Sequence, residues 1–230
     1  MIFIKTHKDF DFNRFDIQQN KYNEFNIISR EQLNNNYPIR ILYENDGNNK
    51  LNQYNKLYGE LTYHYFVYKH LFLFDDIIGM IQYRRAFSKY VLNNYNDILK
   101  EYDAILYKCR LKSTIIQNYE SFHKNNWLNN IIDLLYEYKP EYKKFDFKNV
   151  TLLIPHNIFI MHKNDFIEYS KFIFWCCDLL QEHYNILQYN DDKKYYRMLS
   201  LLGERLSTIF YIKYFLDSNK KIYYDNNINL

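Results

Sequence analysis

Apolar residues along the chain fall into two patterns, short continuous runs and longer stretches in which they recur every three or four positions. The runs are bounded by polar or turn residues, as buried strands are. They predict strands at residues 2–6, 38–43, 77–83 and 102–107 and a last short edge strand at 221–224, with a further apolar stretch around Asn157. Residues 11–36 are polar and irregular, and we expect no regular element there.

The three-to-four spacing predicts amphipathic helices. They cover residues 55–68, 88–100, 127–138 (closed by Pro140), 166–180 and 198–209. Strands that alternate with helices predict an α/β sheet, and the second half of the chain is the more helical. We see no internal repeat, linker or break in composition, and we expect a single domain over residues 1–230.

The charge and hydropathy of the chain restrict its partners. A formal net charge of +3 over 230 residues gives no basic patch of the kind that binds nucleic acid. No apolar run reaches about 18 residues without a charge, so we expect no transmembrane segment. The first residues are too short and too soon polar for a signal peptide. We expect a cytoplasmic protein, with peripheral contact to a membrane left open.

The glycines exclude several enzyme classes. The sequence contains only four of them, and neither GxGxxG nor GxxxxGK[ST] occurs, so the usual phosphate-binding loops are absent. The nucleophile elbow GxSxG and the zinc motif HExxH are missing as well.

The clearest candidate site is Tyr83-Arg84-Arg85, which follows a predicted buried strand. Ligands of open α/β sheets bind beyond the carboxyl ends of strands, and two guanidinium groups there suit a diphosphate. The alternative is that one arginine forms a structural ion pair and the other is solvated.

Three carboxylates and one histidine are further candidates. Glu204, in an apolar helical pattern, could act as a base or orient a sugar hydroxyl, although a helix-surface ion pair with the adjacent arginine is the simpler interpretation. Glu60 has the same ambiguity. Asp46 could bind a ribose or only form a turn. His7, at the end of the first strand, is well placed to meet a ligand.

Several segments resemble, in order, the motifs of a glycosyltransferase-like family of capsule- and exopolysaccharide-associated proteins, described as a domain of unknown function. The matching segments are Tyr58-Gly-Glu-Leu-Thr-Tyr-His-Tyr-Phe-Val-Tyr-Lys69, Ile78-Gly-Met-Ile-Gln-Tyr-Arg-Arg-Ala-Phe87, Tyr102-Asp-Ala-Ile-Leu106, Pro140-Glu-Tyr142, Asn157-Ile-Phe-Ile-Met161 and Gly203-Glu-Arg-Leu206. This chain departs from the family pattern at Gln82, where a His is usual, at Gly203, where an Ala is usual, and at Tyr65 and Tyr68, where Trp is usual.

The resemblance implies a GT-A-like fold, a mixed sheet flanked by helices, that binds a nucleoside-diphosphate sugar, with a UDP-sugar as the first expectation. Enzymes of this type usually hold a divalent metal with an Asp-x-Asp motif after a central strand. Here that strand ends in Tyr-Arg-Arg, so we expect no such metal ligands. The cofactor is left unknown, with Mn²⁺ or Mg²⁺ as open alternatives.

The resemblance also suggests a role for each candidate. Arg84 and Arg85 would neutralise the leaving diphosphate, and Glu204 would face the acceptor. The residues that would bind the nucleotide sugar are His7, Asp46, Asn55, Glu60, Tyr83 and Asn157. The expected reaction transfers a hexose or similar sugar to a glycan or lipid-linked acceptor in surface polysaccharide or glycoconjugate synthesis. A catalytically inactive nucleotide-sugar or glycan binding relative, or a structural interaction protein, is the alternative.

Overall fold

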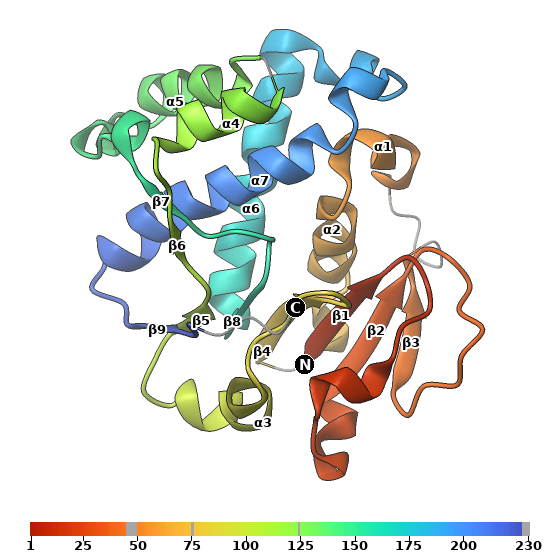
Figure 1. The fold of residues 1–230 in the computed structure, drawn as a ribbon. Helices are drawn as coiled ribbons and strands as arrows, with labels where there is room; N and C mark the ends of the chain where they lie inside the picture. Colours follow the sequence, from red (N-terminus) through yellow and green to blue (C-terminus); the bar gives the residue numbers. More distant parts are fainter. Residues whose placement is uncertain (45–49, 75, 124, 227–230) are drawn as a thin grey trace.

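A seven-stranded mixed sheet forms the centre of the molecule in the computed structural model, which describes residues 1–44, 50–74, 76–123 and 125–226. Its order is β3-β2-β1-β4-β8-β5-β9 (Figure 1). The strands are β1 Ile2–Thr6, β2 Phe25–Ser29, β3 Arg40–Tyr43, β4 Ile77–Gln82, β5 Ala104–Leu106, β8 Phe159–His162 and β9 Ile222–Tyr224. Only β8 runs antiparallel to its neighbours. A separate antiparallel pair joins β6 Cys109–Arg110 to β7 Leu152–Leu153.

Helices cover both faces of the sheet (Figure 1). They are α1 Asn55–Tyr58, α2 Leu61–Lys69, α3 Lys89–Ile98, α4 Ile115–His123, α5 Trp127–Tyr138, α6 Lys163–Tyr184 and α7 Met198–Phe210, which continues into a π-helix at Tyr211–Leu216. Helices α2 and α4 to α7 lie on one side of the sheet, and α3 with the 3-10 turns Phe12–Phe15 and Gln19–Glu24 lies on the other.

Strand residues alternate between two hydrophobic clusters, one on each face. In β1, Phe3 packs into the cluster under α2, α6 and α7, whereas Ile2 and Ile4 pack into the cluster over α3. Met80 and Ile81 of β4 divide in the same way. This two-residue period, with both faces buried, explains why the central strands read as continuous apolar runs.

The predicted mixed α/β architecture with a more helical second half is confirmed, and two local predictions were wrong. Residues 11–36 contain β2, which pairs with both β1 and β3. The helix predicted from Asn55 is interrupted at Gly59, whose φ of 53° ends α1 before α2 begins. No helix among the described residues is long and apolar enough to cross a membrane.

Candidate active site

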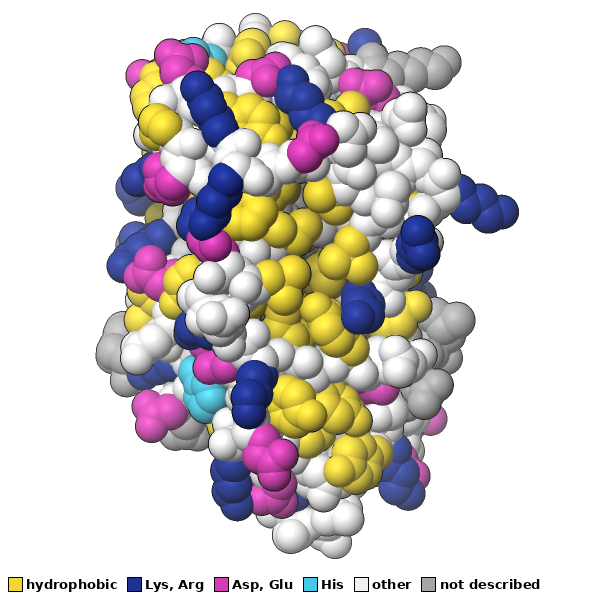
Figure 2. Space-filling view, turned by 90° about the vertical axis from the view of Figure 1, so that its left-hand side faces the viewer, with side chains coloured by type: hydrophobic (Ala, Val, Ile, Leu, Met, Phe, Trp, Pro, Cys, Tyr) yellow, Lys and Arg dark blue, Asp and Glu magenta, His cyan; other side chains and the backbone are white. Residues whose placement is uncertain are grey.

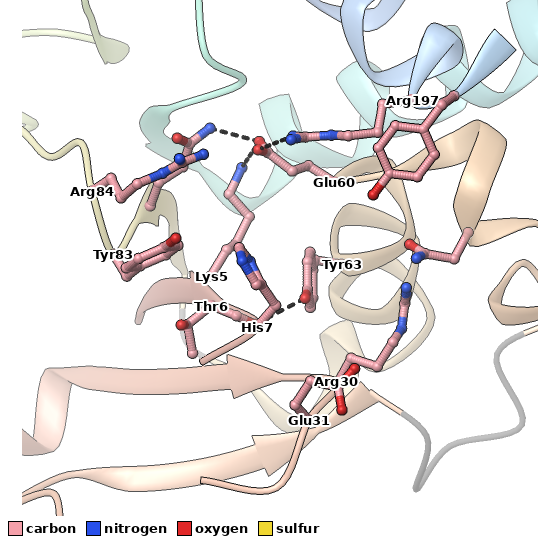
Figure 3. Close-up of a pocket in the computed structure, with 14 residues that line it drawn as sticks. Lys5, Thr6, His7, Arg30, Glu31, Glu60, Tyr63, Tyr83, Arg84 and Arg197 are labelled. Atoms are coloured by element: carbon pink, nitrogen blue, oxygen red, sulfur yellow. Dashed lines mark hydrogen bonds and ion pairs between the residues drawn. The ribbon is translucent and has the colours of Figure 1, made fainter. Parts of the chain in front are cut away.

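A cleft lies where the carboxyl ends of β2, β1 and β4 meet. Strands β2 and β3 lie on one side of β1 and β4 lies on the other, so the strand order reverses at β1, which is the position where open α/β sheets bind ligands. The cleft has a volume of about 380 Å³. Its walls come from the segments after these strands, from the junction of α1 and α2, and from the residues before α7 (Figure 3).

The carboxylate of Glu60 organises one wall of this cleft. Its Oε2 accepts a hydrogen bond from Gln82 Nε2 at 2.6 Å and lies 3.5 Å from Lys5 Nζ, while its Oε1 accepts from Arg197 Nη2 at 2.7 Å. Lys5 and Arg197 both point toward it (Figure 3). One carboxylate thus joins β1, β4 and the start of α7.

Lys5 is a charged residue inside the apolar β1, and it is only 2% exposed. Its ammonium group donates to the carbonyl of Asn157 at 2.9 Å and lies 3.2 Å from His64 Nε2, in addition to Glu60. Burial lowers its pKa, and Glu60 opposes this shift. With these three partners, Lys5 supplies positive potential and positions its neighbours.

Positive charge dominates the rest of the cleft. Among its lining residues, Lys5, Arg30, Arg84 and Arg197 are cationic, against two carboxylates, Glu31 and Glu60. Arg30 is bound to the buried Glu44 at 2.7 Å. Arg84 is exposed and stacks over Tyr83 at 5.3 Å, and no carboxylate of the described residues pairs with it. Its guanidinium is therefore available to an anion.

Aromatic side chains line the cleft beside Arg84. The rings of His7 and Tyr83 meet edge to face with centroids 5.3 Å apart. Across the cleft, the hydroxyl group of Tyr63 donates a hydrogen bond to the carbonyl of Thr6 at 2.8 Å. Burial and the nearby Arg84 lower the pKa of His7, so its imidazole is neutral at pH 7.

Next to the cleft, Glu204 is held by two partners. Its Oε1 accepts from the backbone N–H of His156 at 3.0 Å, and its Oε2 accepts from Arg205 Nη1 at 2.9 Å. Burial raises its pKa, and Arg205 opposes the shift. The ion pair expected between Glu204 and Arg205 exists, but it is not on the exposed surface: Arg205 is buried, at 4% exposure, and Glu204 is part-buried, at 14%.

The structure brings most predicted site residues together. Five of them line the cleft: His7, Asn55, Glu60, Tyr83 and Arg84. Arg85, Asn157 and Glu204 lie beside it and not in its lining. Asp46 falls outside the described residues. Their roles remain predictions.

Sequence reasoning missed Lys5, Arg30, Tyr63 and Arg197, and it treated Gln82 only as a departure from a motif. A signal existed for Lys5 and Gln82, because each is a polar residue at the end of an apolar strand. Arg30 follows β2, which was not predicted. Arg197 has a left-handed backbone (φ 57°) just before α7 and carries no local sequence signal.

The described residues of the cleft do not offer the ligands of a divalent metal. No group of three or more His, Cys, Asp or Glu side chains suited to a metal occurs among the described residues. Glu60 is already engaged by three nitrogen donors. Asp9, in the only Asp-x-Asp of the sequence, accepts the backbone N–H groups of Asn34 and Asn35. The donor set in this part of the chain therefore does not fit the metal that the resemblance implies.

A second hollow of about 670 Å³ lies between α6 and the π-helix. Figure 2 shows hydrophobic side chains gathered along the middle of this flank of the molecule, with Lys, Arg and acidic residues around them. The groove includes Tyr142, Phe172 and Trp175, and its Lys171 and Lys213 are paired with Glu168 and Asp217. A third lining residue, Lys139, stacks over Trp175 at 5.7 Å and pairs with no carboxylate of the described residues, so the groove differs from the cleft in lying away from the carboxyl ends of the strands.

Comparisons with known proteins identify both a family and a fold. A family model described as Domain of unknown function (DUF4422) matches residues 1–215. The apo structure of WbbM, a bifunctional glycosyltransferase, superimposes with a TM-score of 0.70 at 20% identity, over 98% of this chain and 44% of that one. This chain thus spans less than half of WbbM. The expected GT-A-like fold, a mixed sheet flanked by helices, is confirmed.

A second solved structure is the apo form of mouse xyloside xylosyltransferase 1, which aligns at 8% identity over 97% of this chain and 83% of the mouse chain. Its TM-score is 0.38, and we draw nothing from it. No curated protein matches the sequence.

Proposed function

The chain belongs to the family described as Domain of unknown function (DUF4422), and we propose that it is a glycosyltransferase that uses a nucleoside-diphosphate sugar. The observation that carries the proposal is the cationic cleft at the switch point of the sheet, with Arg84 available to an anion. A diphosphate is a compact dianion or trianion, and planar guanidinium groups bind its oxygens in pairs. The shared fold with WbbM supports the same assignment.

In the proposed complex, the diphosphate lies between Arg84 and Arg197. Arg197 is 37% exposed and reaches Glu60 from the opposite wall, so it can turn toward a phosphate without unfolding α7. Lys5 adds positive potential from its position in β1. These fixed charges would stabilise the leaving group as the bond between the sugar and the phosphate breaks, which is an electrostatic form of catalysis. Arg85, next to Arg84, would extend this field toward the acceptor side.

The nucleoside would occupy the remaining walls. His7 and Tyr83 offer ring faces and edges to a base, and Asn55 offers an amide to a ribose. Asp46, assigned to the same task from the sequence, stays a proposal. Glu60 would act by holding the cations, and Asn157 by fixing the backbone beside the transferred sugar. We propose a UDP-sugar as donor, a glycan or lipid-linked acceptor, and a cytoplasmic role in surface polysaccharide or glycoconjugate synthesis.

Thermal shift tests the proposal directly. A ligand that binds only the folded protein raises its melting temperature by mass action. We expect a diphosphate donor, a UDP-sugar ahead of a GDP- or dTDP-sugar, to give a clear shift that is the same with EDTA as with manganese. A CMP-sugar, which has a single phosphate, should give none. A shift that requires manganese would contradict the cationic clamp, and no shift with any donor would contradict the proposed function.

Arg84→Ala supplies the residue-level test. Losing a charge-assisted hydrogen bond to phosphate costs about 1.5–3 kcal/mol, or roughly a 10- to 150-fold weaker Kd. Arg40→Ala is the matched control, because Arg40 is exposed at the opposite, amino-terminal end of β3. If both variants bound the nucleotide like the wild type, Arg84 would not be part of the clamp.

One observation favours a second candidate, an inactive relative that binds nucleotide sugars. Neither carboxylate of the cleft is a ready base, because Glu60 is fully engaged and Glu31 lies on the exposed rim. Slow hydrolysis of the donor in the absence of an acceptor separates the two functions. A transferase releases the nucleoside diphosphate, whereas a binding protein gives the thermal shift without release.

A further inference from the structure

The turn between β7 and β8 is strained. His156 and Asn157 follow one another with φ values of 70° and 51°, in the left-handed region that residues other than glycine seldom adopt. Two such residues in a row cost free energy, and strain of this kind gathers at functional sites. The turn stands at the same edge of the sheet as the cleft, because His156 accepts a hydrogen bond from the cleft residue Gln82.

Four hydrogen bonds hold this turn in place, from three different elements. Gln82 of β4 donates to the carbonyl of His156 at 2.7 Å, and Lys5 of β1 donates to the carbonyl of Asn157 at 2.9 Å. From α7, Glu204 accepts the N–H of His156 at 3.0 Å, and the carbonyl of Ser200 accepts Asn157 Nδ2 at 3.1 Å. The backbone is therefore over-determined, as a strained conformation requires.

What this turn presents is the imidazole of His156. Its side chain is 27% exposed, whereas Asn157 is only 2% exposed. The Nδ1 atom lies 4.0 Å from Glu204 Oε1, so the carboxylate faces that nitrogen. A carboxylate beside Nδ1 favours the tautomer with its proton on Nδ1, which leaves Nε2 as a proton acceptor. Such contacts are often long in the absence of substrate and tighten when it binds.

The charges around His156 keep it neutral. Burial and Arg85 lower its pKa to about 4, and Lys5 and Arg205 act in the same direction. Glu60 opposes them, and Glu204 lies at Nδ1. A bound diphosphate would add negative charge nearby and raise this pKa toward neutrality, where a general base works best.

We propose that His156 is the base that activates the acceptor hydroxyl, and that Glu204 is a positioning residue acting through it; this inference rests on the proposed function. His156 Nε2 takes the proton of the hydroxyl while the hydroxyl oxygen bonds to the anomeric carbon. The bond from that carbon to the phosphate oxygen breaks, and its electron pair leaves with the nucleoside diphosphate. The role first assigned to Glu204 from the sequence thus passes to its neighbour.

Three variants test the assignment: His156→Asn, Glu204→Gln and, as matched control, His183→Asn on the exposed end of α6. Asparagine tolerates the left-handed backbone at residue 156 but is not basic. The readout is release of nucleoside diphosphate from the donor that gives the thermal shift. We expect His156→Asn to lose about 10²- to 10⁴-fold in rate with an unchanged nucleotide-induced shift. Glu204→Gln should lose less of the rate and should displace the acid limb of the pH–rate profile. The control, His183→Asn, should match the wild type in both.

The outcomes separate the two proposals. Full activity of His156→Asn would overturn the assignment. If, in addition, Glu204→Gln were inactive, Glu204 itself would be the base. A wild type that neither binds nor cleaves any donor would overturn the proposed function, and this inference with it. Nitrogen-15 NMR of the wild-type histidines is the second measurement, independent of any variant. We expect neutral His156 with its proton on Nδ1 at pH 7, and an imidazolium there would contradict the proposal.

Discussion

At the scale of single residues, the least expected feature is a buried lysine at the centre of the sheet. A buried charge is costly unless it is paired and hydrogen-bonded. Lys5 meets this condition through Glu60, His64 and Asn157, which come from two other elements of the chain. Lys5 therefore links the cleft wall to the strained turn that carries His156.

Replacing Lys5 by Met should reveal this coupling as lost stability. The substitution removes one partner of a buried ion pair and leaves His64 and the carbonyl of Asn157 without a donor, so we expect a loss of about 3 kcal/mol in the free energy of unfolding. Urea denaturation measures the free energy of unfolding. Lys8→Met is the control, because Lys8 is exposed, and its free energy of unfolding should stay within about 0.5 kcal/mol of the wild type. An equally stable Lys5→Met protein would show that the ion pair is dispensable.

The pKa of His156 gives a second residue-level prediction, on acid stability. Its folded pKa of about 4 lies below the unfolded value of 6.5. Between these pH values the unfolded chain binds a proton that the folded chain does not, so stability is complete above pH 6.5 and falls as the pH drops toward 4. His156→Asn lacks this titration, and its melting temperature should fall less between pH 7 and pH 4.5 than that of the wild type. An equal fall, measured by calorimetry, would contradict the burial of this imidazole.

At the scale of elements, the break between α1 and α2 positions the Glu60 carboxylate. Gly59 has φ 53° and ψ −123°, a conformation that side chains do not favour. A continuous helix from Asn55 would turn Glu60 away from this arrangement, so the interruption is part of the cleft. The helical periodicity of the apolar residues continues across the break, which is why the sequence pattern did not reveal it.

Gly59→Ala should therefore be more harmful than an ordinary glycine substitution. We expect a loss of about 1–3 kcal/mol from the backbone conformation, and the new Cβ would lie 3.0 Å from Ser200 Cβ. Gly203→Ala is the comparison: it lies inside α7, where alanine gains about 1 kcal/mol of helix propensity that offsets a tight contact with Leu61. Chemical denaturation of both variants should place Gly59→Ala clearly below Gly203→Ala, and the reverse order would be inconsistent with the structure.

At the scale of the whole molecule, the sheet is completed by a strand beyond the family match. The match ends at residue 215, yet β9 pairs in parallel with β5, and Asp225 accepts the backbone N–H of Ser88 at the start of α3 at 2.6 Å. Strand β9 and the residue after it thus link the edge of the sheet to α3, the helix on the face opposite α2, α6 and α7.

Ending the chain after Leu216 should test this closure. The truncation exposes the edge of β5 and the side chains packed against β9, so we expect a loss of roughly 2–4 kcal/mol and a tendency to aggregate. Differential scanning calorimetry and light scattering measure both effects. Asp225→Ala, which keeps the strand pairing, separates the contribution of the α3 contact. A truncated protein as stable as the full chain would show that β9 is peripheral to the fold.

The sequence by itself determined the local elements and the chemistry at the strand ends. Apolar periodicity located β1, β3, β4, β5, β9 and every helix except α4, because strand and helix periods are properties of neighbouring residues. The position of Tyr83 and Arg84 after β4 predicted the cleft, since parallel strands end at one edge. Strand β2 escaped detection because Asn26 interrupts its apolar residues and polar residues flank it, so that its pairing with β1 and β3 is what makes it a strand.

Only the tertiary structure decided which of these residues act together. Glu60 meets Arg197 across 137 positions and Gln82 across 22, and Lys5 meets Asn157 across 152. No local pattern encodes such pairs, because they exist only once the strand order has placed β1 between β2 and β4 and packed α7 against them. The strained turn at His156 has the same origin: its backbone is held by side chains from three elements that come together only in the folded molecule.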